Sequence, residues 1–67
     1  MNLAELRTVV AERRARALSA RELADNLLDQ EERQEILRYA DKLDRDVARL
    51  DAEIVAKKTA QNAIDVI

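Results

Sequence analysis

The stretch Ile36–Ile54, with the sequence ILRYADKLDRDVARLDAEI, decides the fold, because its apolar residues recur at alternating intervals of four and three. These apolar residues are Ile36, Ala40, Leu43, Val47, Leu50 and Ile54. This spacing places them on one face of a helix, as in the heptad repeat of a coiled coil. The next two positions are Lys57 and Gln61, so the apolar seam ends or drifts there.

The N-terminal part of the chain repeats this spacing less regularly, because Arg13 interrupts it and several of its members are alanines. Its seam positions are Leu6, Val10, Ala17, Ala20, Ala24 and Leu27. Small alanine side chains let two helix axes approach closely and leave room for the larger side chains of the other helix. The pattern predicts two antiparallel helices, at about 3–27 and 30–61, followed by a C-terminal tail at about 62–67.

Three segments carry a helix start signal, in which a side-chain acceptor is followed three residues later by a glutamate. They begin at Asn2, Ser19 and Asp29, and the signal at Asp29 is the strongest because several acidic residues follow it. We therefore expect the turn at about 26–30, with Asn26 able to adopt left-handed dihedral angles in a chain without glycine. The start signal at Ser19 leaves open whether the first helix is interrupted there.

The composition excludes many kinds of site. The 67 residues include no Cys, His, Gly or Pro. Without Cys and His, the chain lacks the ligands of structural zinc, haem and iron–sulfur clusters. Without Gly, it lacks phosphate-binding loops and the turn of a helix–loop–helix calcium site. We expect a single non-enzymatic domain with no catalytic residue, no cofactor and no metal.

The chain also lacks the apolar segments that membranes require. Its longest uncharged stretch is 59–64, far shorter than the roughly 20 residues of a membrane span. Glu5, Arg7 and Glu12 lie where a signal peptide would be apolar. We therefore expect a cytoplasmic protein, in the host cytoplasm or the virion if a phage encodes it.

The small size of the chain favours self-association. A single core in a chain this short supplies only about 3–5 kcal/mol of stability, and oligomerisation is a common remedy. The expected fold is all-α, an antiparallel helical hairpin whose heptad seam self-associates into a coiled coil or four-helix bundle. A homodimer is the first choice.

Two features are candidates for binding another protein. Tyr39, the only aromatic residue, is either a boundary residue beside the seam or a binding anchor, since tyrosine is enriched at interface hot spots. Ile64, Val66 and Ile67 restore apolar side chains at the end of the chain. They form either a frayed terminus or a docking segment.

Arginines of the first helix are the candidate contacts for nucleic acid. They are Arg7, Arg13, Arg14, Arg16 and Arg21. A phosphate-binding domain usually has a pronounced basic excess and stacking aromatics, whereas this chain has a net charge of −2 and a single aromatic. The favoured interpretation is that these arginines pair with acidic residues of the second helix, such as Glu35, Asp44 or Asp46.

The hairpin scheme, with a short turn at 28–32 and alanines in the core, resembles the Rop family of plasmid RNA-binding regulators over residues 20–50. That resemblance implies RNA contact through a basic and aromatic stripe on the first helix, but this helix contains no Phe. The composition also resembles that of many small phage proteins. The leading hypothesis is a protein–protein interaction module acting as a small adaptor, inhibitor or assembly subunit, and the alternative is a Rop-like nucleic-acid-binding regulator.

Overall fold

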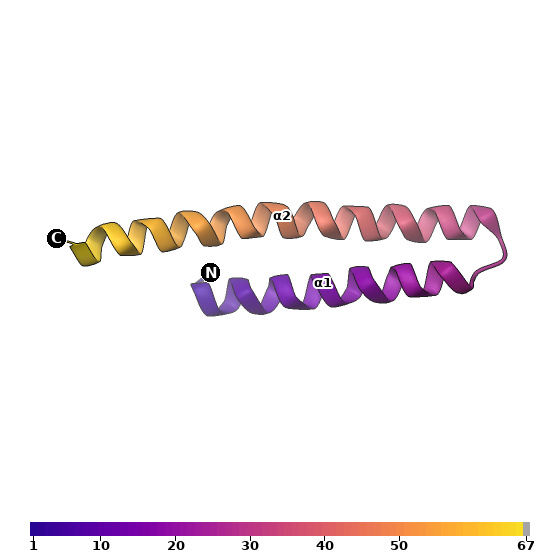
Figure 1. Cartoon of the computed structure of the whole chain (residues 1–67), viewed down its shortest axis with the longest axis horizontal. Helices are drawn as coiled ribbons and strands as arrows, with labels where there is room; N and C mark the ends of the chain where they lie inside the picture. Colours follow the sequence, from indigo (N-terminus) through magenta and orange to yellow (C-terminus); the bar gives the residue numbers. More distant parts are fainter. Residues whose placement is uncertain (67) are drawn as a thin grey trace.

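The computed structural model contains two α-helices, α1 (Leu3–Asn26) and α2 (Gln30–Val66), which pack against each other as an antiparallel hairpin (Figure 1). It describes the backbone of residues 1–66 and the side chains of residues 1–62. Within that part of the chain there is no strand. The predicted all-α hairpin is confirmed.

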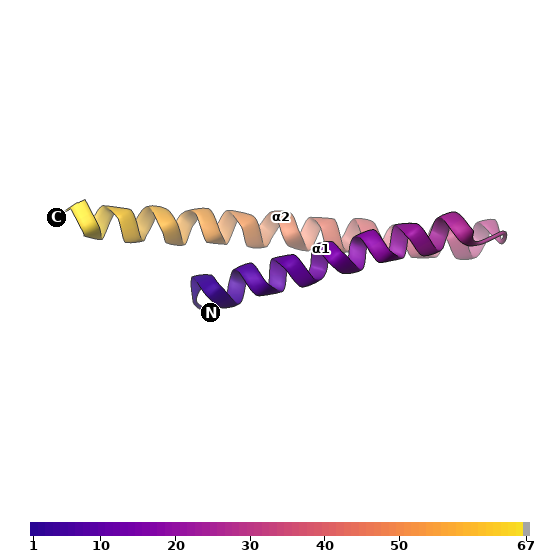
Figure 2. The ribbon, with the colours of Figure 1, turned by 60° about the horizontal axis from the view of Figure 1, so that its bottom comes forward.

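The two helices differ in length, so α2 extends past the start of α1 at the far end from the turn (Figure 1). Helix α1 has 24 residues and α2 has 37, a difference of about 20 Å at 1.5 Å per residue. The hairpin is therefore long and thin, 58 × 15 × 14 Å, and its helices cross at a shallow angle (Figure 2). Helix α2 reaches Val66, beyond the expected end near residue 61, because no Gly or Pro stops it.

Side-chain caps explain where both helices begin. Asn2 Oδ1 accepts a 2.8 Å hydrogen bond from the Glu5 N–H, and Asn2 Nδ2 donates to Glu5 Oε1 at 3.1 Å. Asp29 Oδ1 accepts from the N–H groups of Glu31 and Glu32, at 2.9 and 3.3 Å. Of the three predicted start signals, those at Asn2 and Asp29 are thus used. Ser19 lies inside the continuous helix α1 and starts nothing.

The turn differs from the expectation, because Asn26 does not adopt left-handed dihedral angles. Asn26 is the last residue of α1, and its side chain donates to the Glu22 carbonyl at 3.0 Å. Leu27 then leaves the helix in an extended conformation, with φ −86° and ψ 134°. No residue of the described chain has a positive φ. Extended backbone reverses the chain here without the strain of a left-handed residue.

Arg33 holds the turn from the other side, a role that the sequence pattern did not indicate. Its Nη2 donates a 2.6 Å hydrogen bond to the Leu27 carbonyl, six residues earlier. Helix α1 has no basic residue in its last turn, so Arg33 of α2 brings the positive charge that a helix C-terminus favours. Its Nε is buried and has no hydrogen-bond partner in the described part of the chain.

The core lies along the seam between the helices. In the described part of the chain, its buried side chains are Leu6, Val10, Ala17, Ala20, Ala24, Ala40, Leu43 and Val47. Half of them are alanines, so the core is thin and the helices lie close together. The remaining predicted seam residues are half-buried, namely Leu27, Ile36, Leu50 and Ile54. The seam is therefore covered within one chain.

We expect Asp29→Ala to lower the free energy of unfolding by about 1 kcal/mol, because it removes the acceptor for two N–H groups at the start of α2. Denaturant unfolding followed by circular dichroism measures this loss. Gln30→Ala changes the next, exposed residue and is the matched control, with little effect expected. Equal losses from both variants would contradict the assignment of Asp29 as the cap.

Candidate interaction surface

One side of the hairpin, which we call the ion-pair flank, carries arginines of α1 paired with aspartates of α2. Arg14 Nη2 lies 2.7 Å from Asp51 Oδ2. Arg21 pairs with Asp44 and also lies 3.4 Å from Asp41 Oδ1. Arg14 and Arg21 are seven residues apart, as are Asp44 and Asp51, so each pair of residues lies on one side of its helix. The register of the hairpin thus matches cations with anions.

The ion-pair flank is an electrostatically satisfied surface. The hydrogen bond from Arg21 to the Asp44 carboxylate raises the pKa of Arg21 above its ordinary value, and this outweighs the opposing effect of desolvation. Exposed ion pairs of this kind contribute little to stability, but opposite charges favour one register over another. These guanidinium groups are engaged with carboxylates of their own chain.

Arg13, which interrupts the first seam, reaches from a half-buried position to Asp46, with 4.0 Å between Nε and Oδ2. Asp46 also accepts a 2.8 Å hydrogen bond from Arg49. The favoured interpretation of the basic cluster therefore holds for Arg13, Arg14 and Arg21. Arg7 and Arg16 are exposed, and neither has a carboxylate within 4.0 Å in the described part of the chain.

The opposite side of the seam is an open groove of about 390 Å³ between the two helices. We call it the apolar groove, and its lining residues are Ala15, Arg16, Ser19, Ala20, Leu23, Ile36 and Tyr39. Three residues of the groove each directly precede a seam position, namely Arg16 and Leu23 in α1 and Tyr39 in α2. The charged residues that pair on the ion-pair flank each directly follow a seam position, namely Arg14, Arg21, Asp44 and Asp51. The groove and the ion-pair flank therefore lie on opposite sides of the seam.

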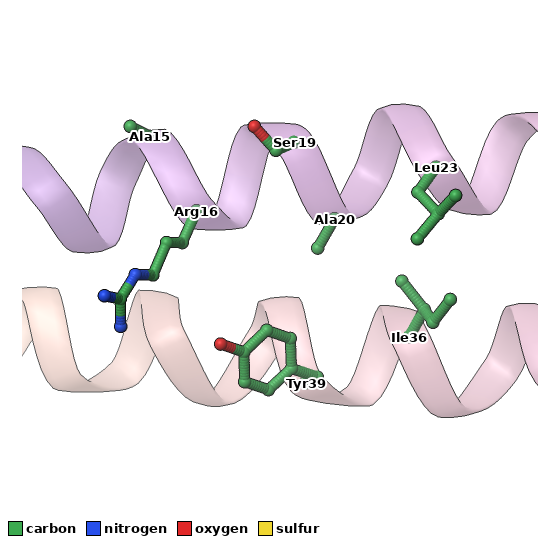
Figure 3. A pocket seen from close by; sticks show the side chains of 7 residues that line it. All are labelled: Ala15, Arg16, Ser19, Ala20, Leu23, Ile36 and Tyr39. Carbon is green, nitrogen blue, oxygen red and sulfur yellow. The ribbon is translucent and has the colours of Figure 1, made fainter.

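The geometry of the groove exposes large apolar side chains. Figure 3 shows Leu23 and Ile36 facing each other across the helices, and Arg16 extending from α1 toward α2. Tyr39 lies between these two ends. Leu23 is 53% exposed and Tyr39 is 49% exposed, because the neighbouring residues Ala20 and Ser19 are too small to cover them. The groove offers apolar contact area rather than a set of chemically reactive side chains.

The residues that the sequence suggested as protein-binding candidates lie in different parts of the chain. Tyr39 lies in the wall of the groove, half-exposed beside the seam. Leu23, Ser19 and Ala15 were not predicted as site residues, although their intervals of four place them on one face of α1. The pattern was missed because only Leu23 is strongly apolar. Ile64, Val66 and Ile67 lie outside the side chains that the structure describes.

Another hollow lies where α2 extends past the start of α1. It is lined by Asn2, Leu3 and Ala4 at the start of α1 and by Lys57, Ala60 and Gln61 of α2. Lys57 and Gln61 are exposed, at the positions where the heptad pattern places them on the seam. This end of the hairpin is more polar than the apolar groove, so the groove is the stronger candidate for binding.

Neither a metal-binding cluster nor a membrane span is found in the described part of the chain. Among the described residues, no group of three or more acidic side chains lies close enough together to hold a metal ion. Neither helix, over its described length, combines the length and the apolar character of a membrane span. Fold and surface together define an all-α helical hairpin with one charged flank and one apolar flank. Comparisons with protein-family models, curated proteins and solved structures find no match for this chain.

Proposed function

We propose that this chain is a non-enzymatic protein–protein interaction module that acts as a small adaptor, an inhibitor or an assembly subunit. The observation that carries the proposal is the apolar groove, where Leu23 and Tyr39 are each about half exposed beside small neighbours. Aromatic and aliphatic anchors in such positions are typical of the centre of a protein interface. The cytoplasmic location stays a prediction.

Self-association into a coiled coil or four-helix bundle, with a dimer as first choice, is part of this proposal. The accessible surface of the chain is 5237 Å², whereas a compact monomer of 7.6 kDa exposes about 4,300 Å². The excess of about 900 Å² is close to the area that each partner contributes to a standard interface, about 800 Å². The hairpin therefore has as much surplus surface as one interface covers.

The thin core supports the same proposal. Half of the buried side chains are alanines, which bury little apolar area on folding. Ordering each residue of a chain costs roughly 1–2 kcal/mol of backbone entropy, so a small core leaves little net stability. Apolar area covered by association would add to that stability.

Nucleic-acid binding is the weaker alternative. Arg13, Arg14 and Arg21 already lie against carboxylates of α2, so phosphates would have to replace these partners. Among the five candidate arginines, Arg7 and Arg16 lack such a partner within 4.0 Å in the described part of the chain. The net charge of −2 also disfavours a polyanion.

We expect the melting temperature to rise with protein concentration, because association links folding to the concentration of chains. Thermal unfolding at several micromolar concentrations, together with mass by light scattering, tests this expectation. A monomer mass with a concentration-independent melt would contradict self-association. In the same buffers, binding to mixed RNA and DNA that weakens steeply with salt would favour the nucleic-acid alternative.

A further inference from the structure

We infer that the apolar groove is the face on which a second copy of this chain docks, with α1 of each copy packed against α2 of the other. The inference rests on the proposed self-association and adds to it the face, the symmetry and the contacts. Most closed dimers have a two-fold axis, which brings the same patch of both copies together. The two-fold axis here runs parallel to the helices.

The groove is complementary to itself. In the middle of the groove its α1 side is formed by the small side chains Ser19 and Ala20, with the larger Arg16 and Leu23 toward its two ends (Figure 3). Its α2 side contributes the ring of Tyr39 opposite the small side chains. A two-fold axis parallel to the helices brings α1 of one copy over α2 of the other. The Tyr39 ring of each copy then lies over the small side chains of its partner, at the level of Ser19.

The choice of axis decides which helices of the two copies become neighbours. With this axis, every neighbouring pair of helices in the four-helix bundle is antiparallel, both within a chain and between chains. Antiparallel neighbours place opposite ends of the helix dipoles side by side, which is the favourable arrangement. The alternative axis, perpendicular to the helices, also gives antiparallel neighbours. It would, however, stack α1 on α1 and place the two small-residue surfaces against each other, leaving a gap.

The ion-pair flank is unfavourable as the contact surface. Docking there would bury Arg14 with Asp51 and Arg21 with Asp44, and removing ion pairs from water costs more than it returns unless the geometry is excellent. The groove contains one charged side chain, Arg16, at its end. Its long aliphatic stem can pack while the guanidinium group stays in water.

Matched leucine variants test the face. Leu23→Asp places a carboxylate in the groove, and Leu18→Asp places one on another side of α1 at a similarly exposed residue, 61% against 53%. We expect Leu23→Asp to raise the dimer dissociation constant by about tenfold or more in sedimentation equilibrium, and Leu18→Asp to leave it nearly unchanged. Equal effects of the two variants would overturn the inference. Helicity by circular dichroism checks that both variants fold.

Cysteine cross-linking tests the symmetry directly, because it reports which residues of the two copies meet. The chain has no cysteine of its own, so introduced thiols have no competitor. Ser19→Cys and Tyr39→Cys are prepared as two separate proteins of different mass, mixed in equal amounts and oxidised. Random pairing alone would give twice as much mixed disulfide as either homodisulfide. We expect the mixed disulfide to exceed this statistical ratio clearly, because Ser19 of one copy faces Tyr39 of the other.

The outcomes separate this inference from the function on which it rests. A dimer mass without an excess of mixed disulfide over the statistical ratio overturns the inference and leaves self-association standing. A dimer in which Ser19→Cys alone cross-links efficiently also overturns it, because that result indicates the perpendicular axis. A monomer mass at high micromolar concentration overturns both, and the groove would then face a different protein.

Discussion

Leu6→Ala and Leu43→Ala are each expected to lower the free energy of unfolding by about 2–5 kcal/mol. Leu6 is 1% exposed and Leu43 is 6% exposed, so truncation leaves a cavity in a core that has few other large side chains. Leu50→Ala should cost less, because Leu50 is only half-buried. Denaturant unfolding at one fixed protein concentration gives these values, since association contributes to the measured stability.

Lys42→Ala is the control for the leucine variants, because Lys42 is an exposed neighbour of Leu43 with no carboxylate within 4.0 Å in the described part of the chain. It should change the free energy of unfolding by no more than about 0.5 kcal/mol. Asp44, the other neighbour of Leu43, is less suitable as a control because its carboxylate pairs with Arg21. Similar losses at Lys42 and Leu43 would mean that the seam is misassigned.

Ala40→Leu is expected to destabilise the hairpin by about 1–3 kcal/mol or more, although it adds apolar area and leucine favours a helix nearly as well as alanine does. Ala40 is 0% exposed, on the α2 side of the alanine-rich interface. A larger side chain there forces the helices apart. The measurement is the midpoint of denaturant unfolding, with the m-value checked for a change of compactness.

Ala48→Leu is the matched control for Ala40→Leu, since Ala48 lies on the exposed face of the same helix. Its free energy of unfolding should change by less than about 0.5 kcal/mol. A neutral or stabilising effect of Ala40→Leu would mean that the interface between the helices has room for a leucine. That result would contradict the tight packing of the helices at Ala40.

Local signals in the sequence determined the helices and their starts. The caps at Asn2 and Asp29 form hydrogen bonds within three residues, and such contacts depend on the neighbouring sequence alone. The heptad spacing of Ile36–Ile54 also predicted which face of α2 is covered, because helical geometry repeats identically along the chain. The extension of α2 to Val66 was missed, since neither a stop signal nor a strong seam marks that segment.

Contacts between the helices could not be read from the sequence in the same way. Which aspartate meets Arg14 or Arg21 depends on the register of two helices, and many carboxylates of α2 are equally plausible partners in the sequence. The hydrogen bond from Arg33 to the Leu27 carbonyl depends on the path of the turn, which was expected to be left-handed at Asn26.

The sequence by itself determined that this chain is a helical hairpin, because periodicity and capping are properties of one helix at a time. Only the tertiary structure decided where the two flanks differ. Tyr39 and Leu23 become one apolar groove when α1 and α2 lie side by side, and the same packing brings the arginines and aspartates together on the other flank. The physical reason is that a groove and an ion pair belong to two elements at once, and their relative register is set by packing.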